Sequence, residues 1–182
     1  MTSDLFKSKY RVESSRLQDW DYSQNGYYFV TICIKNREYL FGQIENDEMV
    51  LSEIGRVAEQ CWHEILSHFT FVELDEFAIM PNHVHGIIVI TKNAETQHIA
   101  SLQSKGQNKF GPQSENLASI IRGFKSGVKK WATVNEIDFD WQPRFYDRII
   151  RNEEELYNVR NYIRYNHLKW NEDEENAAYK NV

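Results

Sequence analysis

The chain has 182 residues, 41% of them hydrophobic and 26% charged, and it carries a formal net charge of −6. These values predict a soluble globular protein of one domain with appendages, large enough to bury a core. No apolar run is long enough to span a bilayer, and residues 1–10 lack the apolar stretch of a signal peptide. We therefore expect a cytoplasmic protein without a membrane partner.

The net charge argues against a nucleic-acid partner, but its distribution is uneven. Between residues 116 and 151 there are seven basic and four acidic side chains, whereas acidic residues concentrate in 38–76 and 172–175. A local basic face can bind phosphates whatever the global sign, although a solvated helix face explains the same pattern. The candidate DNA-binding residues are Arg122, Lys125, Lys129, Arg144, Arg148 and Arg151.

In chain order, the first half shows signals for an arm, a strand, a hairpin and a helix. Residues 1–20 are polar and mixed in charge, and we interpret them as an arm. Residues 27–34 are rich in β-branched and aromatic side chains, which is typical of a central strand. The turn at 45–48 predicts a hairpin, and Ser52 is the expected N-cap of a helix that ends near Ser67.

The second half alternates strands and helices around a polar loop. The periodicity and turn residues predict strands at 69–78, 83–90 and 145–150, a loop at 92–114, and helices at 116–134 and from Glu153 to about Trp170. Residues 171–182 are acidic, and we interpret them as a frayed tail. The order of elements predicts an α+β fold, a ferredoxin-like sandwich with helices on one face of an antiparallel sheet, spanning residues 21–170.

Two histidines flank one residue in the strand that follows Met80-Pro81-Asn82. Side chains at i and i+2 of a strand point to the same face, so the imidazoles of His83 and His85 project together, as two ligands of one metal must. The spacing does not choose among divalent metals. The structural alternative is two unrelated polar residues at a sheet edge.

A second candidate pair lies on the last helix. Tyr162 and Asn166 are four residues apart, about 40° around the helix from each other, and lie beside the apolar stripe of Leu156, Val159 and Ile163. One interpretation is a packing tyrosine and a solvent-facing asparagine. The functional interpretation is a phenol nucleophile with an amide oxygen as a further metal ligand one turn away.

The segment 141–147 mixes aromatic and basic side chains, as surfaces that stack bases and hold phosphates do. A loop that enters the core is the structural alternative.

Four stretches together carry a resemblance to a known family. They are Trp20–Ser23 with Gly26–Cys33, Glu73–Phe77 leading into the string MPNHVHG at 80–86, Phe124–Ser126, and Trp141–Asp147 continuing through Ile150 and Arg151 to Tyr162–Asn166. The sequence resembles the HUH single-strand DNA transposases with one catalytic tyrosine, which comprise insertion-sequence enzymes and REP-associated tyrosine transposases. The pattern over 141–166 is closer to the REP-associated branch.

The resemblance implies a ferredoxin-like domain whose C-terminal helix carries the nucleophile. It implies that Tyr162 is that nucleophile and that His83 and His85 hold a divalent metal, usually Mg²⁺ or Mn²⁺. Asn166 falls where the insertion-sequence enzymes have a metal-binding glutamine and the REP-associated ones an asparagine. His167 departs from the family pattern, which continues with proline, so we expect the helix to run on.

The function implied is cleavage and strand transfer of single-stranded DNA near hairpins, through a 5′-phosphotyrosine intermediate. The expected partner is single-stranded or hairpin DNA, the expected place is the nucleoid, and a homodimer is compatible with the sequence. Two alternatives stay open: a hairpin-binding protein that has lost activity, and a metal-dependent hydrolase that uses only the two histidines. Whether Tyr162 serves its own subunit or a partner's also stays open.

Overall fold

The computed structural model describes residues 20–92, 114–173 and 175–176; nearly all of the expected arm and of the expected polar loop lie outside these ranges. A four-stranded sheet in the order β4-β5-β1-β6 forms the centre, and every neighbouring pair is antiparallel. Its strands are β1 (Gly26–Cys33), β4 (Val72–Met80), β5 (His83–Ile90) and β6 (Tyr146–Ile150).

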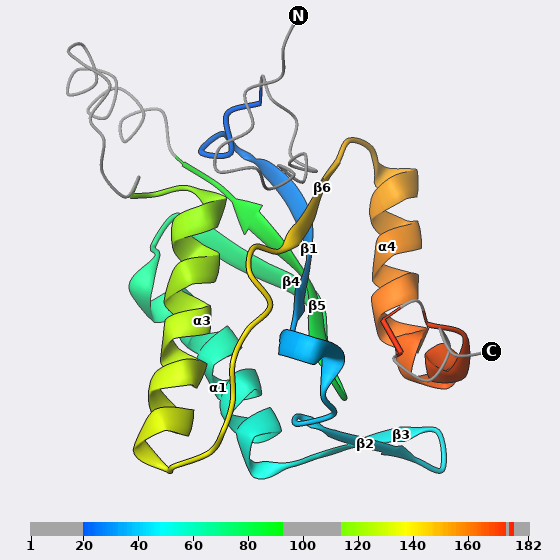
Figure 1. Ribbon diagram of the computed structural model, residues 1–182. Helices are drawn as coiled ribbons and strands as arrows, with labels where there is room; N and C mark the ends of the chain where they lie inside the picture. Colours follow the sequence, from blue (N-terminus) through cyan, green and yellow to red (C-terminus); the bar gives the residue numbers. More distant parts are fainter. Residues whose placement is uncertain (1–19, 93–113, 174, 177–182) are drawn as a thin grey trace, which may run out of the picture.

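Three helices cover the sheet, two on one face and one on the other (Figure 1). They are α1 (Glu53–His68) and α3 (Leu117–Val134), packed side by side, and α4 (Glu153–Tyr165) on the opposite face. Helix α1 links β1 to β4 and α3 links β5 to β6, and each linked pair has one antiparallel strand between its members. This double split β-α-β arrangement is the ferredoxin-like sandwich, and it confirms the predicted fold class.

A two-stranded hairpin stands apart from the main sheet. It consists of β2 (Gly42–Glu45) and β3 (Glu48–Leu51), joined by Asn46 and Asp47 with φ values of 50° and 63°. Two successive positive φ angles define the tight turn that matches strand twist, and Asn and Asp tolerate them. Ser52 then caps α1 by accepting from the Gly55 backbone N–H, as predicted.

Side-chain alternation gives the sheet two apolar faces. Tyr28, Val30 and Ile32 of β1 belong to the large core with α1 and α3, whereas Phe29 belongs to a small cluster with Leu156 and Ile163 of α4. In β5, Val84, Ile88 and Ile90 face the large core and Ile87 and Val89 the small one. His83 and His85 share the parity of Ile87, so they belong to the α4 face.

The last helix ends earlier than its pattern predicts. Helix α4 stops at Tyr165 and tightens into the 3-10 segment η3 (Asn166–Glu172), so the expectation of one α-helix to Trp170 is wrong. The interpretation of the residues after Asn171 as frayed is also wrong for those that the structure describes, because Asp173 and Asn176 are buried. Glu175 forms an ion pair with Arg37 at 2.8 Å, which helps to hold this segment against the domain.

None of the helices within the described ranges has the length and apolar character required to cross a bilayer.

Candidate active site

His83 and His85 are buried side by side at the start of β5, facing α4. Their ring centroids lie 4.3 Å apart in an edge-to-face arrangement. Burial lowers the pKa of His83 to about 3 and that of His85 well below its ordinary value, because desolvation penalises the charged form. Both rings are therefore neutral at physiological pH, which is the state that a metal ligand requires.

The tautomer of His83 is fixed by its neighbour Asn82. The Asn82 amide nitrogen donates to the backbone carbonyls of Arg37 (3.2 Å) and Glu175 (2.7 Å), so its Oδ1 is the atom 2.8 Å from His83 Nδ1. An amide oxygen only accepts, so Nδ1 carries the proton and Nε2 keeps its lone pair. That Nε2 is buried and has no hydrogen-bond partner among the described residues.

His85 is held between a threonine and the candidate nucleophile. Its Nδ1 lies 2.9 Å from Thr31 Oγ1, and its Nε2 lies 3.1 Å from the Tyr162 hydroxyl. In the tautomer whose Nδ1 donates to Thr31, Nε2 presents its lone pair to the phenol, which is the arrangement of sites where a hydrogen bond orients a metal-binding imidazole.

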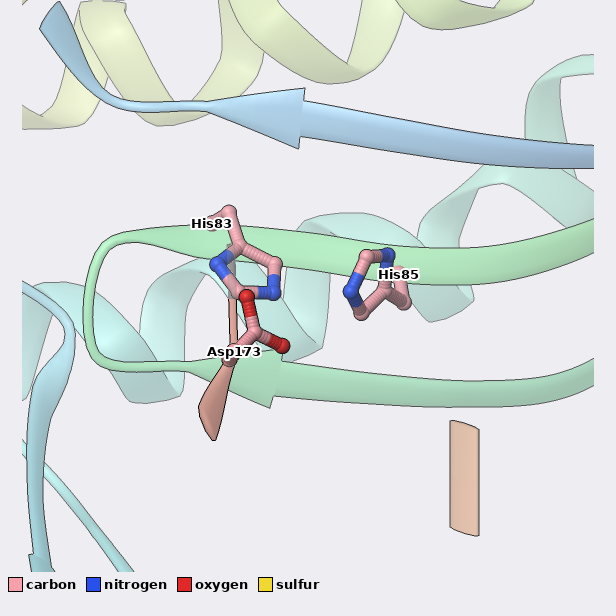
Figure 2. A group of neighbouring side chains, drawn as sticks. All are labelled: His83, His85 and Asp173. Carbon is pink, nitrogen blue, oxygen red and sulfur yellow. The ribbon is translucent and has the colours of Figure 1, made fainter. Parts of the chain in front are cut away.

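An acidic side chain that the sequence analysis did not select completes this cluster. Asp173 follows η3, and its carboxylate, His83 and His85 each offer a ligand atom within 4.8 Å of the others. Figure 2 shows the Asp173 carboxylate beside the His83 ring, with His85 two residues along the same strand. Asp173 is only 7% exposed, so its charge acts in surroundings from which water is largely excluded.

Asn166 is buried next to this carboxylate. Its Nδ2 donates to Asp173 Oδ2 at 2.7 Å, which leaves Oδ1 as the remaining polar atom. Asn166 Oδ1 is buried and has no hydrogen-bond partner within the described residues, just like His83 Nε2. Two orphaned lone pairs beside a buried carboxylate are what a bound cation would satisfy, so the residues present fit a divalent metal.

Tyr162 combines contact with the cluster and access to solvent. Its ring packs edge-on against Phe29 (centroids 6.0 Å apart) and against His85 (5.1 Å). The residue nevertheless remains 47% exposed. A nucleophile that attacks a macromolecule needs this combination, because its ring must be positioned while its oxygen stays reachable.

Comparisons with known proteins find relatives in sequence and in fold. No family model matches the chain. A Haemophilus influenzae protein of uncharacterised function is 40% identical over 96% of this chain and 98% of its own length. A second protein of that organism, named as a REP-associated tyrosine transposase, is 24% identical over 82% of this chain and 74% of its own length. A solved REP-associated tyrosine transposase bound to a REP hairpin superposes with a TM-score of 0.57 at 19% identity, over 90% of this chain and 74% of that one.

The chain resembles the tyrosine transposases in sequence and in fold. For this tyrosine transposase relative, the structure brings together the residues expected to act as nucleophile and metal ligands, although they come from separate elements. His83 and His85 are on β5, Tyr162 is on α4 and Asn166 begins η3. Their roles in catalysis and metal binding stay predictions.

Three neighbours of this cluster escaped the sequence analysis. Thr31 had a weak signal, as a hydroxyl in an otherwise apolar strand, and Asn82 had one as the residue before the histidines. Asp173 had none, because it is one of four consecutive acidic residues and the two histidines beside it lie far away in the chain.

The six predicted DNA-binding residues of this transposase relative do not gather on one face. Arg122, Lys125 and Lys129 are on α3, which covers the sheet face opposite the histidines. Lys125 donates to the carbonyls of Gln142 (2.8 Å) and Arg144 (2.6 Å), and burial lowers its pKa to about 8. Lys129 donates to the Phe139 carbonyl. These two lysines brace the segment that leads into β6.

The other three candidates, Arg144, Arg148 and Arg151, lie on β6 or in the segments that flank it. Arg148 is paired across the strands with Phe29, so the two side chains share the α4 face, and it forms an ion pair with Glu155 at 2.6 Å. Arg144 and Arg151 are exposed in the segments flanking β6. DNA binding by all six residues stays a prediction.

One end of the segment 141–147 fits the interpretation as a loop that enters the core, and the other end fits the interpretation as an exposed aromatic surface. Trp141 is buried and packs against Phe41, Phe124 and Phe139, as a loop entering the core would place it. Tyr146, by contrast, is exposed at the start of β6 and contacts Phe29 edge-on.

Proposed function

We propose that this protein is a metal-dependent DNA strand transferase that cleaves single-stranded DNA near hairpins through a 5′-phosphotyrosine. The observation that carries the proposal is the 3.1 Å separation between the Tyr162 hydroxyl and His85 Nε2, inside a cluster with two further orphaned ligand atoms. Similarity in sequence and in fold to REP-associated tyrosine transposases supports the same chemistry.

The metal-binding groups would be His83 and His85 through Nε2 and Asn166 through Oδ1, with the Asp173 carboxylate beside them. Oxygen ligands suit Mg²⁺ and Mn²⁺, and imidazole suits the later transition metals, so Mn²⁺ tolerates this mixed set better than Mg²⁺. When bound, the ion would polarise the scissile phosphate and offset its developing charge.

Tyr162 is proposed to attack the phosphorus, and the reaction balances without water. A bond forms between the phenol oxygen and phosphorus, and the bond from phosphorus to the 3′-oxygen breaks. The phenol gives up its proton, and the departing 3′-oxygen gains one. Because the phosphotyrosine keeps the energy of the diester, the 3′-hydroxyl of another strand can reverse the step, which is strand transfer.

The proposed substrate is DNA with a single-stranded stretch next to a hairpin. The related transposase of known structure is bound to a REP hairpin, which is a precedent in that protein. In this chain the net charge of −6 gives little general attraction to duplex phosphates. The exposed ring of Tyr146 and the half-exposed ring of Tyr162 instead suit contact with unstacked bases.

The decisive experiment is a search for a protein–DNA adduct that survives denaturation. Protein would be incubated with Mn²⁺ and an end-labelled library of DNA hairpins that carry single-stranded flanks. We expect an adduct joined through a 5′-phosphate in the wild type and none in Tyr162→Phe. Tyr165→Phe is the matched control, because Tyr165 is 49% exposed on the same helix and no described contact joins it to the histidines.

The same experiment separates the alternatives. A hairpin-binding protein without activity would shift the labelled hairpin on a native gel without any adduct or cleavage. A hydrolase would still cleave after Tyr162→Phe, and the buried Asp173 gives that alternative the third ligand that the two histidines alone lack. An adduct that persists in Tyr162→Phe or maps to Tyr165 would contradict the proposal.

A further inference from the structure

Strand β4 contains an irregularity directly beneath the nucleophile helix. Leu74 pairs with Ile88 and Phe77 with Gly86, so Asp75 and Glu76 together oppose the single residue Ile87. This is a β-bulge, in which one strand carries one residue more than its partner. We call Asp75 and Glu76 the acidic bulge.

The bulge directs two consecutive carboxylates toward α4. In a regular strand, neighbouring side chains point to opposite faces, so only one of the two could reach the helix. Here Asp75 accepts from Arg160 Nε at 2.8 Å and from its Nη2 at 2.5 Å, and Glu76 forms an ion pair with Arg164. Arg160 and Arg164 are four residues apart, so they lie on one side of α4 and flank Tyr162 along the helix.

Among the described residues, α4 has one other ion pair to the sheet, between Glu155 in its first turn and Arg148 of β6 at 2.6 Å. The only buried residues of α4 are Leu156 and Ile163, with Val159 partly buried against the same small cluster. A thin apolar seam allows sliding and rotation, because packing of this kind has no direction. A bidentate arginine–carboxylate pair does have direction, since the two planar groups match in only a few geometries.

We infer that the acidic bulge is a positioning device that sets the axial register and rotation of α4, so that Tyr162 of each chain is presented to His85 of the same chain. This inference rests on the proposed function, and Asp75 and Glu76 act in it as positioning residues through Arg160 and Arg164. A slip of one helical residue moves the helix by about 1.5 Å and turns it by about 100°. Either displacement would break the contact between Tyr162 and His85.

The test neutralises the acidic bulge without changing its shape, in Asp75→Asn/Glu76→Gln. Removing carboxylates cannot remove a contact with phosphate, so a slower reaction would not reflect weaker DNA binding. We expect the rate of adduct formation at saturating DNA to fall by about 10-fold to 100-fold, as for misplacement of a reacting group. The DNA concentration for half-maximal rate should change little. Glu64→Gln is the matched control, an exposed carboxylate paired with Gln60 on α1.

Two further measurements complete the test. Combining Asp75→Asn with Arg160→Gln should lower the rate of adduct formation no further than either change alone, because both changes remove the same interaction. Mixing Tyr162→Phe chains with His83→Ala/His85→Ala chains should give no adduct, because each site draws its tyrosine from its own chain. An adduct from that mixture would overturn the inference, as would a wild-type rate in the neutralised variant.

Hydrogen exchange distinguishes failure of this inference from failure of the proposed function. The neutralised variant should show faster amide exchange in α4 and unchanged exchange in α1, with no DNA present. If the wild type forms no adduct with any DNA, the proposed function fails, and exchange alone decides whether the acidic bulge holds α4. Unchanged exchange in α4 would overturn the inference even if the wild type is active.

Discussion

The Tyr162 hydroxyl lies 3.1 Å from His85 Nε2, although 77 residues separate them in the chain. His85 also has its Nδ1 2.9 Å from Thr31 Oγ1 on the neighbouring strand. One imidazole thus links β1, β5 and α4. Any change to the orientation of that ring should therefore alter both its contact with the Tyr162 hydroxyl and the position of Nε2, the proposed metal-binding atom.

Thr31→Val tests how far this orientation matters. Valine keeps the shape of threonine and removes the hydroxyl that partners His85 Nδ1, so the ring loses a hydrogen bond that orients it. We expect Mn²⁺ affinity, measured by calorimetric titration, to fall by about 10-fold to 100-fold, as for other changes to partners of ligating histidines. Thr91→Val is the control, because Thr91 is exposed near the far end of β5. An unchanged Mn²⁺ affinity in Thr31→Val would show that Thr31 does not contribute to metal binding.

Gly86 and Gly123 give a matched pair of predictions for stability. A Cβ at Gly86 would run into the indole of Trp62, which packs on the sheet from α1, whereas one at Gly123 would meet only Phe69 at 3.6 Å. Gly86→Ala should therefore lower the free energy of unfolding by about 1–3 kcal/mol, as overpacking does. Gly123→Ala, within α3, should raise it by up to about 1 kcal/mol through helix propensity. Denaturant unfolding measures both, and equal effects would contradict the close approach of Trp62.

The sequence predicted those features that depend on short-range periodicity. Alternation placed His83 and His85 on one face, and Ser52 caps α1 as its side-chain chemistry indicates. The end of α4 was misjudged, since nothing local marks the change to a tighter helix at Asn166.

Long-range contacts were beyond such reasoning. Asp75 meets Arg160 across 85 residues, and the bulge that turns it toward α4 leaves no pattern in the sequence. Asp173 looked like part of a solvated tail because its burial depends on how the C-terminal segment folds back over β5. The sequence also did not indicate that Lys125, a predicted DNA-binding residue, donates to the carbonyls of Gln142 and Arg144.

The ion pair between Asp75 and Arg160 predicts a pH dependence of stability. Hydrogen bonds from Arg160 lower the pKa of Asp75 below its ordinary value of 3.8, so the unfolded chain binds more protons in the interval between the two values. The pair therefore stabilises the fold above about pH 4 and loses this effect as the pH falls through the folded-state pKa. Because Arg160 is 39% exposed, solvent screening limits the contribution to about 1 kcal/mol.

Thermal unfolding of wild type and Asp75→Asn between pH 2 and pH 7 checks this sign. The wild type should be the more stable at pH 6, and the difference should vanish in the acid range. A difference that grows as the pH falls would contradict the assignment.

Asn166→Ala separates the role of the amide oxygen from that of the phenol. Asn166 Oδ1 is buried without a described partner and its Nδ2 donates to Asp173, so the amide is oriented by the carboxylate and keeps one lone pair free. If that lone pair is a metal ligand, Asn166→Ala should still form the adduct at Tyr162, but more slowly and with a higher Mn²⁺ requirement. Excess Mn²⁺ should partly restore the rate.

Asn166→Asp is the informative partner variant. It keeps an oxygen at the ligand position but places a second carboxylate against Asp173, and like charges at that distance favour protonation of one of them. We therefore expect Asn166→Asp to bind Mn²⁺ with an affinity that rises more steeply with pH than that of the wild type. Equal Mn²⁺ requirements in Asn166→Ala and the wild type, measured as adduct rate against Mn²⁺ concentration, would remove Asn166 from the ligand set and leave the histidines and Asp173.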